Sequence, residues 1–152
     1  MKQFLKGSLL FACLLLTLMS CHVNSVYLNR EEDKKDAEKV TNKLFELIKT
    51  KDYKQTTGLF SKQFYEVSSK EKLFDIFTAT NLKLGNLQET KIETWETKRV
   101  VGSNPSANYT LVYNNKYEKF ESKEIIKLTR DADGIIRIFG YHINSDGFLN
   151  LK

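Results

Sequence analysis

The chain has 152 residues, of which 41% are hydrophobic, 12% aromatic and 28% charged, and its formal net charge is +5. This length suits one domain with an appendage, and the composition excludes a disordered, collagen-like or multi-span membrane protein. Without Lys2 and Lys6, 22 basic residues remain against 19 acidic ones, a balance of +3. So small a balance does not indicate a concentrated basic face, and we expect no nucleic-acid partner.

The first twenty residues have the pattern of an export signal. Lys2 and Lys6 supply a positive start, and residues 7–19 follow without any charge. This run of about 13 residues is shorter than the roughly 20 that a spanning helix needs. It therefore predicts a cleaved signal peptide over residues 1–20.

The apolar run ends in Leu18-Met19-Ser20-Cys21. An aliphatic residue, a small residue before the cut and then cysteine resemble the lipobox of bacterial lipoproteins, from which Met19 departs by its size. The resemblance implies lipid attachment, palmitate included, at the Cys21 thiol. It implies a protein exported from the cytoplasm and held by N-terminal lipid at the cell membrane or the outer membrane. An ordinary secretion signal and an uncleaved signal anchor are the alternatives.

Cysteine usage agrees with this interpretation. Cys13 lies inside the predicted leader, and Cys21 would carry lipid. The mature chain would then have no thiol for a disulfide or a metal. Residues 21–36 are expected to form a lipidated tether, since residues 29–36 include no apolar side chain. Residues 37–152 are expected to form a single α+β domain.

Helices are predicted in the first half of this domain. Apolar residues at steps of three and four predict a helix over about 31–50, with Ala37, Leu44 and Ile48 on one face. A short helix is expected over 53–60, and Ser61 can cap a brief turn. Ser68 and Glu71 have capping-box spacing before a helix that should end near Asn81, with Gly85 available for a left-handed turn.

Strands are predicted in the second half. Residues 87–101 form a long strand with a bulge between Ile92 and Trp95. A second strand follows the turn at 102–105 and ends in a hairpin at Asn114-Asn115. Strands over 117–129 and 135–143 flank a turn at 131–134. The last strand is apolar in both phases, which predicts a central place in the sheet.

Helices followed by hairpin-linked strands predict an α+β fold, with N-terminal helices packed on a curved four-stranded antiparallel sheet. This order resembles the nuclear-transport-factor-like or cystatin-like cone, and more narrowly the domains of unknown function of small bacterial lipoproteins. The related families often have Trp after the last glycine turn, where this chain has Ile136. The segments behind the resemblance are Asp52-Tyr53, Leu59-Phe60-Ser61 with Phe64, Leu84-Gly85-Asn86-Leu87, and residues 133–138 with Gly140-Tyr141.

Few residues suggest chemistry. The chain has only His22 and His142, and no nucleophile elbow, phosphate loop or zinc motif. Asp131 and Asp133 lack the further ligands of a calcium loop and fit a hairpin turn better. We therefore expect no metal, no cofactor and no catalytic motif.

The cone resemblance implies one enzymatic alternative. Such domains can use a buried carboxylate and a tyrosine for proton transfer. Glu124 is in phase with the apolar residues of its strand, and Tyr113, Tyr141 and His142 could lie near it. The competing interpretation is that Glu124 turns into water.

Binding is the preferred interpretation of the many aromatic residues in the sheet. They could line a cleft for a small apolar ligand or a peptide, or they could simply fill the core. The predicted function is a non-catalytic ligand- or protein-binding module whose partner is an envelope protein, a small apolar ligand or a second copy in a homodimer. The alternative is a small enzyme of proton transfer or hydrolysis. The candidate pocket comprises Trp95, Tyr109, Tyr113, Phe120, Glu124, Tyr141 and His142.

Overall fold

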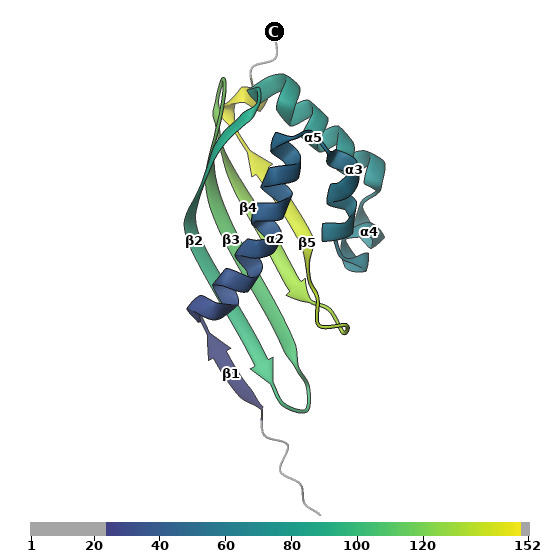
Figure 1. The fold of residues 1–152 in the computed structure, drawn as a ribbon, viewed down its shortest axis with the longest axis vertical. Coiled ribbons are helices and arrows are strands. Elements are labelled where there is room, and N and C mark those ends of the chain that lie inside the picture. The colour runs from purple at the N-terminus through teal and green to yellow at the C-terminus, as the bar shows by residue number, and fades with distance from the viewer. Residues whose placement is uncertain (1–23, 150–152) are drawn as a thin grey trace, which may run out of the picture.

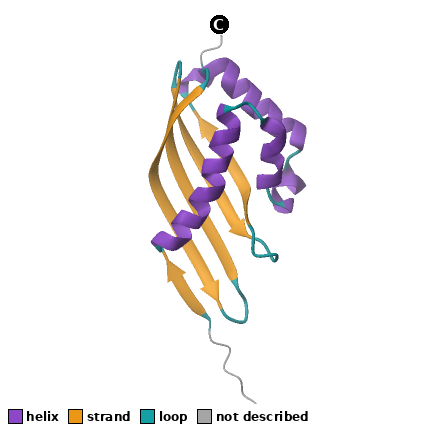
Figure 2. Cartoon of the chain, viewed as in Figure 1, coloured by secondary structure: helices purple, strands orange, loops and turns teal. Residues whose placement is uncertain are grey.

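The computed structural model describes residues 24–149, which form a curved antiparallel sheet with helices on one of its faces (Figures 1 and 2). The predicted signal peptide and Cys21 lie outside these residues. The strands are β1 (Ser25–Leu28), β2 (Leu87–Val101), β3 (Ser106–Tyr117), β4 (Glu121–Arg130) and β5 (Ile136–Asn144). The helices are α2 (Glu31–Lys49), α3 (Tyr53–Thr56), α4 (Lys62–Val67) and α5 (Lys70–Leu84), with 3-10 turns η1 (Thr57–Leu59) and η2 (Asp146–Phe148).

The α+β class is confirmed, but the sheet has five strands in the order β1-β2-β3-β4-β5 instead of the predicted four. The extra strand, β1, comes from the segment that we expected to be a tether. Its four residues pair with the end of β2, from Ser25 opposite Val101 to Leu28 opposite Lys98. A strand this short is held mainly by backbone hydrogen bonds to its neighbour, so its side-chain pattern is too brief to predict it.

Helix α2 confirms the predicted apolar stripe. The helix lies across the sheet in Figure 1, and its residues Ala37 and Leu44 are fully buried. Three acidic residues occupy its first turn, where the helix dipole favours them. One of these, Asp33, is buried as well.

The short helices differ from the prediction in detail. The segment expected as one helix over 53–60 divides into α3 and η1. Ser61 caps α4, as predicted, by accepting a hydrogen bond from the Phe64 amide. The cap of α5 is Ser69, whose hydroxyl accepts from the Lys72 amide, and not Ser68. The helix continues to Leu84 and ends at Gly85, which has a φ of 86°. Glycine adopts such a positive φ with little strain because it has no Cβ.

The predicted hairpin at Asn114-Asn115 is wrong. Both residues lie inside β3, opposite Lys123 and Ser122 of β4. The chain turns after Tyr117, whose amide donates to the Phe120 carbonyl. Asparagine favours turns, but here the continuing strand pairing on both sides of β3 decides the backbone conformation.

The predicted central place of the last strand is also wrong, since β5 is the edge strand next to β4. Its ladder slips at Phe139: Leu128 pairs with Ile138, but Lys127 pairs with Gly140. The bulge turns residues of both phases toward the helices, which accounts for the apolar residues in both phases. The open edge is partly covered, because the Ser61 amide donates to the Ile138 carbonyl.

The expected bulge in β2 is confirmed, with a register shift between Ile92 and Thr94. Alternate residues of β3 and β4 are buried under the helices, and the residues between them point away from the helices. The core therefore lies between the helices and the sheet. No helix within residues 24–149 is both long and apolar enough to cross a bilayer.

Candidate functional site

Glu124 is the most unusual side chain of the core. It projects from β4 toward the helices, and its side chain is 0% exposed. One carboxylate oxygen accepts hydrogen bonds from the Tyr117 hydroxyl and the Ser122 hydroxyl, both at 2.9 Å. The other accepts from the Tyr141 hydroxyl at 2.6 Å. We call these four residues the carboxylate–hydroxyl cluster.

Three strands supply the cluster. Ser122 and Glu124 are two apart on β4, so their side chains share one face. Tyr117 is the last residue of β3, and Tyr141 follows the bulge of β5, where it pairs with Ile126. The Tyr141 ring packs edge-on against Phe77 of α5 at 5.6 Å, which fixes it over the carboxylate.

Burial and the carboxylate keep both cluster tyrosines protonated. Burial raises the pKa of the Tyr117 hydroxyl, and the nearby Glu124 carboxylate raises it further. The pKa of Tyr141 is raised well above its usual value by the same two causes. The phenols therefore act as neutral donors to Glu124 at physiological pH. Such charge-assisted hydrogen bonds are stronger than neutral ones.

Asn115 adds further polar atoms beside the cluster. It faces the helices from β3, opposite Ser122, and is 1% exposed. Both atoms of its amide lack a hydrogen-bond partner within residues 24–149. Unpaired amides are rare in cores because their desolvation is costly.

The structure separates most of the residues of the candidate pocket. Glu124 and Tyr141 are in direct contact, but the Tyr113 hydroxyl bonds instead to the Thr41 hydroxyl of α2 at 2.6 Å. Burial raises the pKa of Tyr113 to about 12. Its ring meets Phe45 edge-on at 4.9 Å.

The other members of the candidate pocket lie apart from the cluster. Tyr109 is a core residue, and Trp95 lies under the ammonium group of Lys34, 5.3 Å from its ring. Phe120 packs on the core beside the turn that ends β3. His142 is exposed and pairs with Ile125, one residue out of phase with Glu124. It lines a shallow hollow of about 320 Å³ beside Gly140.

Sequence reasoning missed Tyr117, Ser122 and Asn115. The signal for Ser122 was present, because it shares the phase of Glu124, Ile126 and Leu128 along β4. Tyr117 was hidden by the misplaced hairpin, which put a turn where β3 continues.

The geometry limits what the cluster can do chemically. A substrate would have to displace a hydroxyl before it reached the Glu124 carboxylate, since that side chain has no exposed surface. General acid–base catalysis needs the reacting proton within hydrogen-bond reach. As arranged, the cluster joins three strands through one carboxylate.

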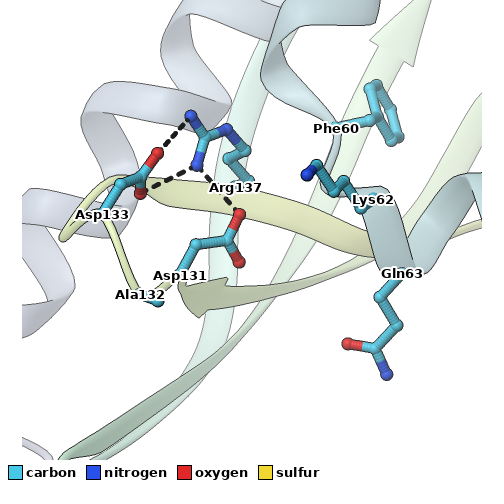
Figure 3. Close-up of a pocket in the computed structure, with 7 residues that line it drawn as sticks. All are labelled: Phe60, Lys62, Gln63, Asp131, Ala132, Asp133 and Arg137. Atoms are coloured by element: carbon cyan, nitrogen blue, oxygen red, sulfur yellow. Dashed lines mark hydrogen bonds and ion pairs between the residues drawn. The ribbon is translucent and has the colours of Figure 1, made fainter.

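A separate pocket lies away from the cluster, between the start of α4 and the β4–β5 turn (Figure 3). Its volume is about 500 Å³. Arg137 bonds to Asp131 at 2.9 Å and to Asp133 at 2.8 Å, so its charge is balanced within the pocket. The hydrogen bond from Arg137 is the main cause that lowers the pKa of Asp133. Lys62 and Gln63 are exposed on the opposite wall and could meet a polar ligand.

A further pocket of about 420 Å³ lies between the β2–β3 and β4–β5 turns. Arg99 and Arg130 line it, and each already pairs with an acid of α2, Asp33 and Asp36 respectively. No group of three or more potential metal-ligating side chains occurs among the residues that the structure describes. Comparison with known proteins finds no family model that matches the chain, and no curated protein that matches it.

Proposed function

We propose that this protein is exported and anchored by lipid at Cys21, and that its domain is a non-catalytic module that binds a ligand or another envelope protein. The observation that carries the anchoring is the position of Cys21, directly after Ser20 and the uncharged run 7–19. Each buried methylene contributes about 0.8 kcal/mol, so two or three acyl chains would hold the protein at a bilayer.

The order of elements supports a cone of the nuclear-transport-factor-like or cystatin-like kind. A first strand leads into the long helix α2, and β2 to β5 then form a meander beneath that helix. Fold resemblance of this kind does not carry an activity with it.

The bonding of Glu124 supports binding over catalysis in the domain. Both carboxylate oxygens accept hydrogen bonds from neighbouring hydroxyls, and the side chain is enclosed in the core. The aromatic residues of the candidate pocket that are buried, Tyr109 and Tyr113, serve the same core. Surfaces outside this core are left for a partner, among them the pocket beside Lys62.

An enzyme of proton transfer or hydrolysis is the second candidate. It is favoured by one observation, the 2.6 Å hydrogen bond between Tyr141 and Glu124, which places an acid and a phenol side by side. Catalysis by this pair would require the domain to open and admit a substrate.

The anchor is tested by Cys21→Ala in cells fed with a labelled fatty acid. We expect the wild-type protein to take up label and to sediment with membranes, and the variant to do neither. Membrane retention of an unlabelled wild-type protein would contradict the proposed anchor.

The two candidate functions of the domain are separated by Glu124→Gln, which preserves side-chain shape but removes the carboxylate. We expect the variant to reverse any phenotype caused by deleting the gene and to capture the same partner from crosslinked envelopes. A variant that is folded and still captures that partner, but leaves the deletion phenotype in place, would favour the enzyme.

A further inference from the structure

Exposed apolar side chains gather at one end of the sheet. Nine large hydrophobic residues are exposed within residues 24–149, and four of them lie together here. They are Val26 and Leu28, which share one face of β1, and Tyr27 of β1 and Val101 at the end of β2, which lie on the opposite face. We call these four residues the β1 patch. Isolated exposed hydrophobics are ordinary, but several of them at one end of a sheet indicate a surface that something covers.

The β1 patch is close to the proposed anchor along the chain. The side chain of Asn24 accepts a hydrogen bond from the Asn104 amide, which ties the chain to the β2–β3 turn just before β1. Only two residues separate Asn24 from Cys21. Three steps of extended chain span at most about 11 Å. A lipid on Cys21 would therefore hold this end of the sheet against the headgroup layer, which is only about 5–8 Å thick.

From this placement we infer that the β1 patch rests on the bilayer surface, an inference that depends on the lipid anchor of the proposed function. Val26 and Leu28 share the face of the sheet that the helices leave open, and they contact the lipid headgroup and glycerol region. The long axis of the molecule then rises from the membrane, with α5 at the far end (Figure 1).

The polar neighbours of the patch suit a headgroup layer. Lys98 pairs with Leu28 across the ladder, is exposed, and has no ion pair among the described residues. A lysine at this place can lay its stem along the apolar surface and direct its ammonium group to a lipid phosphate. Tyr27 lies under the Arg30 guanidinium at 4.4 Å, and tyrosine is enriched at membrane interfaces.

A quenching experiment tests this contact on the full-length protein. The mature chain offers no free thiol once Cys21 carries lipid, so Leu28→Cys introduces a single labelling site. The purified lipidated variant is labelled with an environment-sensitive fluorophore and reconstituted in phosphatidylethanolamine–phosphatidylglycerol vesicles. We expect nitroxide-labelled headgroups to abolish most of its fluorescence.

Leu82→Cys is the matched control, because Leu82 is 71% exposed and Leu28 is 64% exposed. Leu82 lies in α5, so its label should keep its fluorescence in the same vesicles. Unquenched label at position 28 would overturn the inference, whether water or a second copy covers the patch. Flotation tests the anchor separately: if the lipid anchor is absent, protein without the fluorophore will not float with the vesicles.

Discussion

Hydroxyl groups replace a cation as the partners of the buried acid Glu124. A carboxylate without a nearby opposite charge is costly in a core unless its oxygens are hydrogen-bonded. Tyr117, Ser122 and Tyr141 supply three such bonds, and they come from three adjacent strands. The cluster therefore contributes to the stability of the sheet at the end where β3 turns into β4.

Two tyrosine substitutions measure this contribution. Tyr141→Phe removes a hydrogen bond to a charged acceptor, so we expect it to lower the free energy of unfolding by about 1.5–3 kcal/mol. Tyr113→Phe removes a bond to the neutral hydroxyl of Thr41, which contributes about 0.5–1.5 kcal/mol. Urea denaturation of both variants measures the difference. Equal losses would show that Glu124 does not strengthen the bond.

The start of α2 is attached to the sheet by its own first turn. Asp33 accepts from Arg30 at 2.8 Å and pairs with Arg99 of β2 at 3.3 Å. The preceding corner is closed by Asn29, whose side chain accepts from the Thr97 amide. The acidic first turn thus does more than favour the helix dipole, because one of its acids joins the helix to its own N-cap residue, Arg30, and to β2.

Acid should weaken this attachment. Burial alone would raise the pKa of Asp33, but its hydrogen bonds with Arg30 and Arg99 lower it below the usual value. A carboxyl whose pKa is lowered in the folded state adds stability above its unfolded pKa of about 3.9, and that stability is lost as the pH falls through the folded value. The pKa of Asp36 is lowered as well, chiefly by Lys39.

We therefore expect Asp33→Asn to lower the free energy of unfolding at neutral pH by about 1–2 kcal/mol, since both arginines are partly exposed. The variant should also lose less stability than the wild type when the pH falls below about 4. Urea titrations at both pH values check this. Asp75→Asn on the exposed side of α5 is the control, and an identical acid response in Asp33→Asn would refute the argument.

At the end of the molecule opposite β1, the C-terminal turn η2 packs against α5 and the β3–β4 loop. Gly147 is buried there, and a Cβ added to it would collide with Leu84 of α5 and come within 2.7 Å of Phe120. The last turn thus packs between the end of α5 and the β3–β4 loop. Phe120 takes part in this closure, and not in a cleft.

Gly147→Ala should therefore destabilise the fold by about 1–3 kcal/mol, as expected for overpacking a core. Gly58→Ala is the matched control, because a Cβ at Gly58 meets nothing within 4 Å. At an unhindered site this change typically raises stability by about 0.4–1 kcal/mol. Thermal unfolding of the two variants compares them, and similar melting temperatures would exclude tight packing around η2.

Local patterns alone determined the long helix α2, the bulged strand β2 and the glycine end of α5, and they also predict the leader with Cys21. Each follows from neighbouring residues, because helix and strand periods are set within a few positions of backbone. Only the tertiary structure decided that β1 joins the sheet, that β5 lies at its edge and that Tyr117 reaches Glu124. Strand order, register and bulges depend on pairing between residues far apart in the chain, and one shifted residue turns every following side chain to the other face.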